Sequence, residues 1–216
     1  MDLNTGWNLL RSRIREQGVR VTAWWAADHV VRILTGANVR RLSQITPQLY
    51  VGGQHRRRGW GRMRRWGVTA VVNMRIEYDD AQAGVASDRH LHLPVEDDTA
   101  PTLEQLHTGS RFIAAEIERG GVVYVHCGSG IGRAPTMAAA YFITVGLTAE
   151  EALDHIRARR PFIRPTAVQL EQLARFAMRQ GDRGVGSNHG SRPERNSSLG
   201  NRRRDSSLER SREHGP

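Results

Sequence analysis

Residues 122–133 read Val-Val-Tyr-Val-His-Cys-Gly-Ser-Gly-Ile-Gly-Arg, and a run with helical periodicity follows at 134–145. An apolar strand therefore ends at Cys127, a glycine-rich loop follows it, and a helix begins near Arg133. Glycines let a loop turn so that successive backbone N–H groups point inward and form an anion-binding nest. The helix N-terminus adds partial positive charge at the same point. The stretch therefore indicates an α/β fold with an oxyanion site at the end of a strand.

Cys127 and Arg133 carry the chemistry that this loop predicts. Inward N–H groups and the guanidinium would stabilise the Cys127 thiolate and hold it against a tetrahedral oxyanion. The alternative is a buried cysteine that closes a strand beside an ordinary glycine turn. The strand, the His-Cys pair, the glycines and the arginine together favour the phosphate site. The predicted phosphate-binding residues are Gly128, Ser129, Gly130, Ile131, Gly132 and Arg133.

The rest of the chain alternates short apolar runs with longer helical patterns. Such alternation predicts an α/β domain with a central mixed sheet flanked by helices. Strands are expected at 49–51, 69–74, 90–93 and 122–125, and helices at 103–119, 134–145, 149–159 and 166–179.

Composition divides the chain into three segments. Residues 1–42 form a basic segment in which apolar positions from Val21 recur at three- and four-residue steps, as in an amphipathic helix. Residues 43–180 form the expected folded domain. Residues 181–216 are rich in Arg and Ser and nearly devoid of apolar side chains, so this tail is predicted to be disordered.

The charge and the cysteine count exclude several classes of protein. The formal net charge is +10, and all 32 basic residues are arginine, which suits phosphate but equally fits a biased codon usage. One cysteine excludes an intramolecular disulfide and a multi-cysteine metal site. No run of about 18 apolar residues is present, so we expect no membrane span and a cytoplasmic protein.

The loop resembles a known family. His126-Cys127, the glycines and Arg133 match the His-Cys-x5-Arg signature of protein tyrosine and dual-specificity phosphatases. Residues 45–53, 66–74 and 160–163 are similar to further segments of the dual-specificity phosphatases. The resemblance implies their fold and a phosphocysteine intermediate formed on Cys127, with Arg133 binding phosphate and His126 supporting the loop. It implies no cofactor and no catalytic metal.

The same resemblance places the general acid in the loop after the strand at 90–93. This loop holds Asp97, the leading candidate, and Asp98, the second. Such an acid would protonate the leaving oxygen and then activate water. The alternative is that these acids cap the helix near residue 103 or are only solvated, although Thr102 also offers a cap.

One position departs from the family pattern. Most members carry Ser or Thr after the arginine, where the hydroxyl donates to the cysteine sulfur, but this chain has Ala134. A slow enzyme or a phosphate-binding module therefore stays open beside the phosphatase. A third hypothesis is a sulfurtransferase of the rhodanese type. The position of Asp97 upstream of the cysteine fits that hypothesis poorly.

Substrate and partner signals are weaker. The loop between Cys127 and Arg133 is neutral, which favours phosphotyrosine or another monophosphate and leaves a lipid or small-molecule phosphate open as the alternative. Phosphoserine and phosphothreonine in proteins are further candidate substrates. A cluster of arginines lies between residues 56 and 65, together with Trp60 and Trp66. It either attracts acidic peptides, nucleic acid or anionic membrane through its charge, or it forms a solvated helix face with the tryptophans packed inward. For residues 1–42 we favour packing on the domain over membrane contact.

Overall fold

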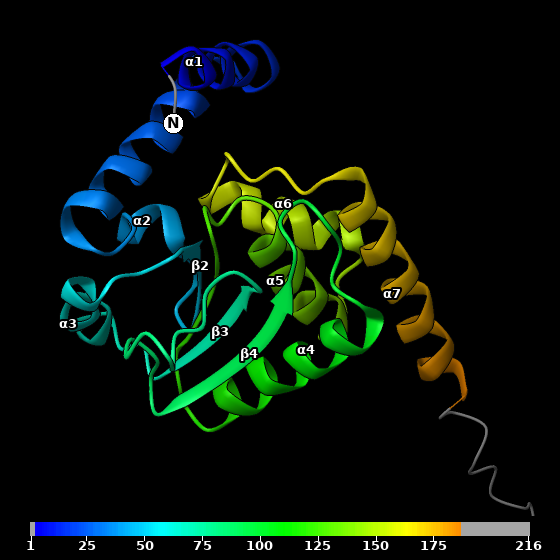
Figure 1. Cartoon of the computed structure of the whole chain (residues 1–216). Coiled ribbons are helices and arrows are strands. Elements are labelled where there is room, and N and C mark those ends of the chain that lie inside the picture. The colour runs from blue at the N-terminus through cyan, green and yellow to red at the C-terminus, as the bar shows by residue number, and fades with distance from the viewer. Residues whose placement is uncertain (1–2, 187–216) are drawn as a thin grey trace, which may run out of the picture.

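A five-stranded sheet forms the centre of the fold in the computed structural model, which describes residues 3–186 (Figure 1). The strand order is β1-β2-β5-β3-β4, with β1 antiparallel to β2 and every other neighbouring pair parallel. The mixed sheet predicted from the sequence is therefore confirmed. The strands are β1 (Gln44–Thr46), β2 (Leu49–Gly53), β3 (Ala70–Arg75), β4 (Arg89–Val95) and β5 (Val123–Cys127).

Helices cover both faces of this sheet. Side chains of neighbouring strand residues point to opposite faces, and the two faces carry separate apolar clusters. Helix α3 (Arg57–Arg65) lies on the smaller cluster, and four later helices pack on the main core. These are α4 (Leu103–Glu118), α5 (Arg133–Thr144), α6 (Ala149–Arg159) and α7 (Ala167–Gly186).

The predicted elements differ from the observed ones mainly at their ends. The run at 45–53 forms two strands, because the chain turns at Pro47-Gln48 and β2 pairs back on β1. Of the two readings of the arginine cluster, the structure has the inward-packed helix: Trp66 stacks on Tyr50 at 5.7 Å, while the arginines of α3 are exposed.

The N-terminal segment contains α1 (Leu3–Thr35) and α2 (Arg40–Ser43). Gly18 interrupts α1 with φ +81°, a conformation that glycine adopts without strain. In the second half of α1, Asp28 and Arg32 are buried, so this part of the helix packs against the rest of the protein.

The C-terminal helix α7 continues to Gly186, beyond the boundary expected at 180. The remainder of the predicted tail, 187–216, lies outside the described residues. No helix in the described part of the chain is long and apolar enough to cross a membrane.

Candidate active site

The glycine loop joins the last residue of β5, Cys127, to the first residue of α5, Arg133. Cys127 is 3% exposed, and its Sγ accepts a hydrogen bond from the N–H of Gly130 at 3.3 Å. Gly130 has φ +70°, and a Cβ there would lie 2.2 Å from the carbonyl carbon of Gly52. Only glycine fits this position, so the tight turn that brings an N–H onto the sulfur depends on it.

All the carbonyl groups of the loop are bonded to groups outside it. Because their acceptors are satisfied there, the opposite side of the loop is left to the backbone N–H groups. Backbone N–H groups bond three of these carbonyls: Gln54 donates to Gly128, Arg164 to Ile131 and Thr136 to Gly132. The Arg160 side chain bonds the other two, with Nη2 donating to Ser129 and Nε to Gly130.

Arg160, which is fully buried, supplies two of these bonds. Its Nη2 donates to the Ser129 carbonyl at 3.1 Å and its Nε to the Gly130 carbonyl at 2.7 Å. The same Nη2 forms an ion pair with Asp28 of α1 at 3.1 Å. Asp28 also accepts from the Asn38 side chain at 2.6 Å. The N-terminal helix is thus connected to the loop through a buried salt bridge.

Arg133 is 1% exposed and is held by two acids and a carbonyl. Glu77 accepts from Nη1 and Nη2, both at 2.9 Å, in a bidentate pair. Asp97 pairs with Nη2 at 2.9 Å, and the Val95 carbonyl accepts from Nη1 at 2.7 Å. Burial lowers the pKa of Arg133, but Glu77 and the charges of Cys127 and Asp97 raise it above its ordinary value. The guanidinium is therefore positive and fixed in orientation.

The Nε of Arg133 is buried and has no hydrogen-bond partner among the described residues. Buried donors are nearly always bonded, so an unpaired one beside a nest of amides points to an anion as its partner.

Of the two candidate acids, Asp97 contacts Arg133 and Asp98 does not. Asp98 has φ +60°, and its backbone carbonyl accepts from the hydroxyl of Thr166 at 3.0 Å. Thr102 caps α4 with Gln105, so neither aspartate is needed for that cap.

Glu77 is a site residue that the sequence analysis did not identify. It follows β3, which lies beside β5, so an acid just after that strand was the available signal. Its hydrogen bond with Arg133 is the main reason that the pKa of Glu77 falls to about 2.

The Glu77 pairing predicts a pH dependence of stability. The folded-state pKa is about 2 against an ordinary 4.5, so the stabilisation is complete above pH 4.5 and is lost as the pH falls toward 2. The difference in unfolding free energy between wild type and Glu77→Gln should therefore narrow as the pH falls from about 4.5 to about 2. Urea unfolding at several pH values measures it, and a constant difference would contradict the pairing.

His126 is fully buried and pairs with Asp80, Nε2 to Oδ2, at 2.6 Å. Burial raises the pKa of Asp80, but the hydrogen bond and charge of His126 lower it overall. The ring of His55 lies 5.1 Å from that of His126, and burial lowers the pKa of His55 to about 4. His126 is thus fixed directly before Cys127.

Ala134 is fully buried in the first turn of α5. The nearby hydroxyl of Thr136 donates to the Gly132 carbonyl at 3.0 Å. In the part of the chain that the structure describes, Gly130 N–H is the one hydrogen-bond donor to the Cys127 sulfur.

A cavity of about 550 Å³ opens beside the loop, where Gly128 and Ser129 line it. Three arginines from other elements also line it: Arg32 of α1, Arg56 before α3 and Arg75 at the end of β3. Glu77 and Asp97 line it as well, and Arg75 pairs with Glu77 at 2.8 Å, so Arg32 and Arg56 are the cavity's arginines outside the Arg133 ion-pair network.

Residues 49–179 match the family model described as the dual specificity phosphatase catalytic domain. Human dual specificity protein phosphatase 5 is 33% identical over 138 residues, which cover 62% of this chain and 35% of that protein. The mouse protein named phosphatidylglycerophosphatase and protein-tyrosine phosphatase 1 is 37% identical over 121 residues, covering 50% of this chain and 61% of the relative.

A similar solved structure is that of PTPMT1 in complex with PI(5)P, with a TM-score of 0.60 and 29% identity over 65% of this chain and 96% of that one. The chain spans about a third of the length of the human relative. Because the family model matches residues 49–179, more than half of the chain, the protein belongs to the dual-specificity phosphatase family.

Proposed function

We propose that this protein hydrolyses phosphomonoesters through a phosphocysteine intermediate. The preferred substrates are proteins that carry phosphotyrosine, or phosphoserine and phosphothreonine. The observation that carries the proposal is the loop: its carbonyls turn outward, Cys127 lies at its base, and the buried Arg133 Nε has no protein partner among the described residues. The family match supports the same chemistry.

In the proposed reaction a phosphate oxygen takes the place of Asp97 on Arg133 Nη2, and a second oxygen binds Nε. The Cys127 thiolate attacks phosphorus and the ester oxygen leaves with a proton from Asp97, which is 77% exposed on its loop. Asp97 then removes a proton from water, whose attack on phosphocysteine releases phosphate and the thiolate.

Turnover of para-nitrophenyl phosphate at about pH 6 in the presence of a chelator tests this proposal. We expect hydrolysis, competitive inhibition by vanadate, and a phosphoenzyme that acid quenching traps on Cys127. Vanadate binding without turnover would favour the alternative, a phosphate-binding module. Neither binding nor turnover would refute the phosphate site. The family match speaks against the sulfurtransferase reading.

Asp97→Asn should lower kcat by about 10²- to 10⁴-fold, because it removes the proposed general acid. Asp98→Asn is the matched control, since Asp98 does not contact Arg133, and should change kcat less than about threefold. Steady-state kinetics of both variants decide the assignment. The reverse order of effects would give the acid role to Asp98.

Ala134→Ser should speed hydrolysis of the phosphocysteine about tenfold or more. A hydroxyl next to Arg133 would add a second donor to the leaving sulfur, and hydrogen bonds to charged groups contribute about 1.5–3 kcal/mol. Quenched-flow measurement of phosphoenzyme decay tests this, with Ala134→Gly to control for the change in size. Decay no faster than in wild type would mean that the Gly130 donor is sufficient.

A phosphorylated lipid is the second candidate substrate. Arg32 and Arg56 at the cavity favour a substrate with a second anionic group, and one relative was solved with PI(5)P. Comparing kcat/KM for a phosphotyrosine peptide and for PI(5)P in vesicles separates the two candidate substrates. Arg56 is exposed, and Arg56→Gln should lower kcat/KM only for the polyanionic substrate.

A nucleophilic thiol requires a reducing compartment, so we infer a cytoplasmic location. The inward packing of Trp66 leaves nucleic acid or membrane binding by the arginine cluster without support from the aromatic residues.

A further inference from the structure

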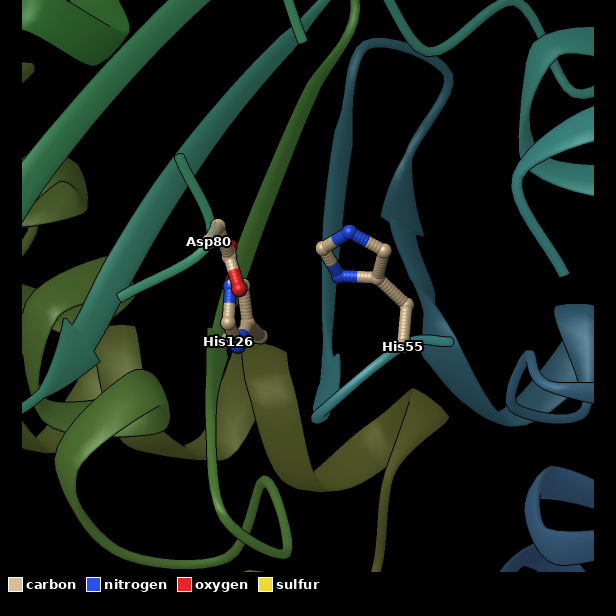
Figure 2. A group of neighbouring side chains, drawn as sticks. All are labelled: His55, Asp80 and His126. Atoms are coloured by element: carbon tan, nitrogen blue, oxygen red, sulfur yellow. Dashed lines mark hydrogen bonds and ion pairs between the residues drawn. The ribbon is translucent and has the colours of Figure 1, made fainter. Parts of the chain in front are cut away.

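Three buried side chains that the proposed reaction does not use as reactants gather behind the catalytic loop. His55 lies between β2 and α3, Asp80 lies between β3 and β4, and His126 is the next-to-last residue of β5. Each is at most 2% exposed. One nitrogen from each histidine and one oxygen from Asp80 all lie within 4.8 Å of one another. Figure 2 shows the His55 ring facing the Asp80–His126 pair.

His55 presents an unused lone pair to this group. Its Nε2 lies 2.8 Å from the Val85 carbonyl and must donate a hydrogen there, because a carbonyl only accepts. In the neutral ring Nδ1 is therefore an acceptor. That nitrogen is buried, has no partner among the described residues, and lies on the side of the ring that faces Asp80 and His126 (Figure 2).

Two of the three side chains, His55 and Asp80, have neighbouring bonds of the kind that orient metal ligands in proteins, whereas His126 Nδ1 has no partner among the described residues. A ligating histidine commonly donates its second N–H to a carbonyl, as His55 does to Val85, and ligating carboxylates are themselves hydrogen-bonded. The Oδ1 of Asp80 accepts from the Gln54 side chain at 2.8 Å, which leaves Oδ2 for the centre of the group.

We propose that His55 Nδ1, Asp80 Oδ2 and His126 Nε2 form a zinc-binding site. Two imidazoles and a carboxylate are a ligand set that zinc uses, with metal–ligand distances of about 2.0–2.2 Å, and such sites keep a fourth position for water. The zinc would replace the proton now shared by His126 and Asp80, and the two would separate slightly while His55 moves inward.

The site has a route of entry and a place next to the catalytic loop. His55 and Gln54 both line the cavity beside Gly128, so the buried group lies directly behind the cavity wall, and an ion would enter through a movement of these two side chains. A bound zinc would join three segments and fix His126 directly before Cys127. This proposal does not depend on the phosphatase activity.

The test is calorimetric titration of ZnCl₂ into chelator-treated, desalted Cys127→Ser protein, in which the thiol cannot compete as a ligand. His55→Gln and Asp80→Asn should each bind one zinc ion fewer per chain than the parent. His155→Gln, which removes an exposed imidazole on α6, should leave that site intact. Cobalt(II) should give the visible absorption of a four-coordinate ion in the parent and lose it in His55→Gln.

Circular dichroism shows which variants fold. If His55→Gln does not fold, the zinc stoichiometry of the isosteric Asp80→Asn variant decides the question. Loss of one ion in a folded variant supports the site. Equal zinc stoichiometry and affinity in the parent and in a folded His55→Gln or Asp80→Asn variant would overturn it, as would a parent that binds no zinc.

Discussion

Cys127→Ser should lower kcat for para-nitrophenyl phosphate by about 10⁴-fold or more while the protein keeps its affinity for inorganic phosphate. A serine hydroxyl is a far weaker nucleophile than a thiolate at the pH of the assay. The substitution is nearly isosteric, and a serine oxygen can also accept the bond that Gly130 N–H now donates to the sulfur. The other bonds that shape the loop come from its carbonyls and from Arg133. The loss should therefore lie in the chemical step.

Kinetics and phosphate binding on the same preparation separate chemistry from binding. The chain has one cysteine, so no other thiol can take over the reaction. Retained activity above about a tenth of wild type would place the nucleophile on another residue. Loss of phosphate binding together with activity would instead mean that the substitution disturbs the loop.

The sheet and its helices could be predicted because their signals are local. The apolar run before Cys127, the glycines after it and the helical periodicity from residue 134 each depend on a few neighbouring residues. Capping boxes also start α4 and α6, at Thr102 and Thr148, so these helix starts are encoded within one turn.

The parts of the site that the sequence analysis missed depend on contacts between distant segments. Glu77 reaches Arg133 because β3 lies beside β5 in the sheet, an order that periodicity does not specify. Arg32 lines the cavity from α1. The charge of the site therefore could not be predicted from the neutral loop alone, because the arginines of the cavity come from elsewhere in the chain.

The zinc ligands show the same limit. His55, Asp80 and His126 lie in three segments with no ligand spacing in the sequence, and a search for clustered cysteines and histidines passes over them. Only the sheet order brings the ends of β2, β3 and β5 together at one edge.

The salt bridge between Asp28 and Arg160 is the clearest contact between distant segments, because it joins residues 132 positions apart. Asp28→Ala should lower the free energy of unfolding by about 3–5 kcal/mol, the usual cost of removing one partner of a buried ion pair. Both side chains are at most 4% exposed, and Arg160 would keep its charge without a counter-ion. Because Arg160 also holds the Ser129 and Gly130 carbonyls, kcat should fall as well.

Asp154→Ala is the matched control for this prediction. Asp154 pairs with Arg157 at 2.7 Å, but both are exposed, and such pairs contribute about 0.2–1 kcal/mol. Urea unfolding of the two alanine variants and of the isosteric Asp28→Asn compares a buried with an exposed ion pair in one protein. Equal small losses for Asp28→Ala and Asp154→Ala would mean that α1 only covers the domain. A large loss confined to Asp28, with reduced kcat in the folded protein, would make the second half of α1 a part of the catalytic unit, since its carboxylate then fixes the arginine that shapes the phosphate loop.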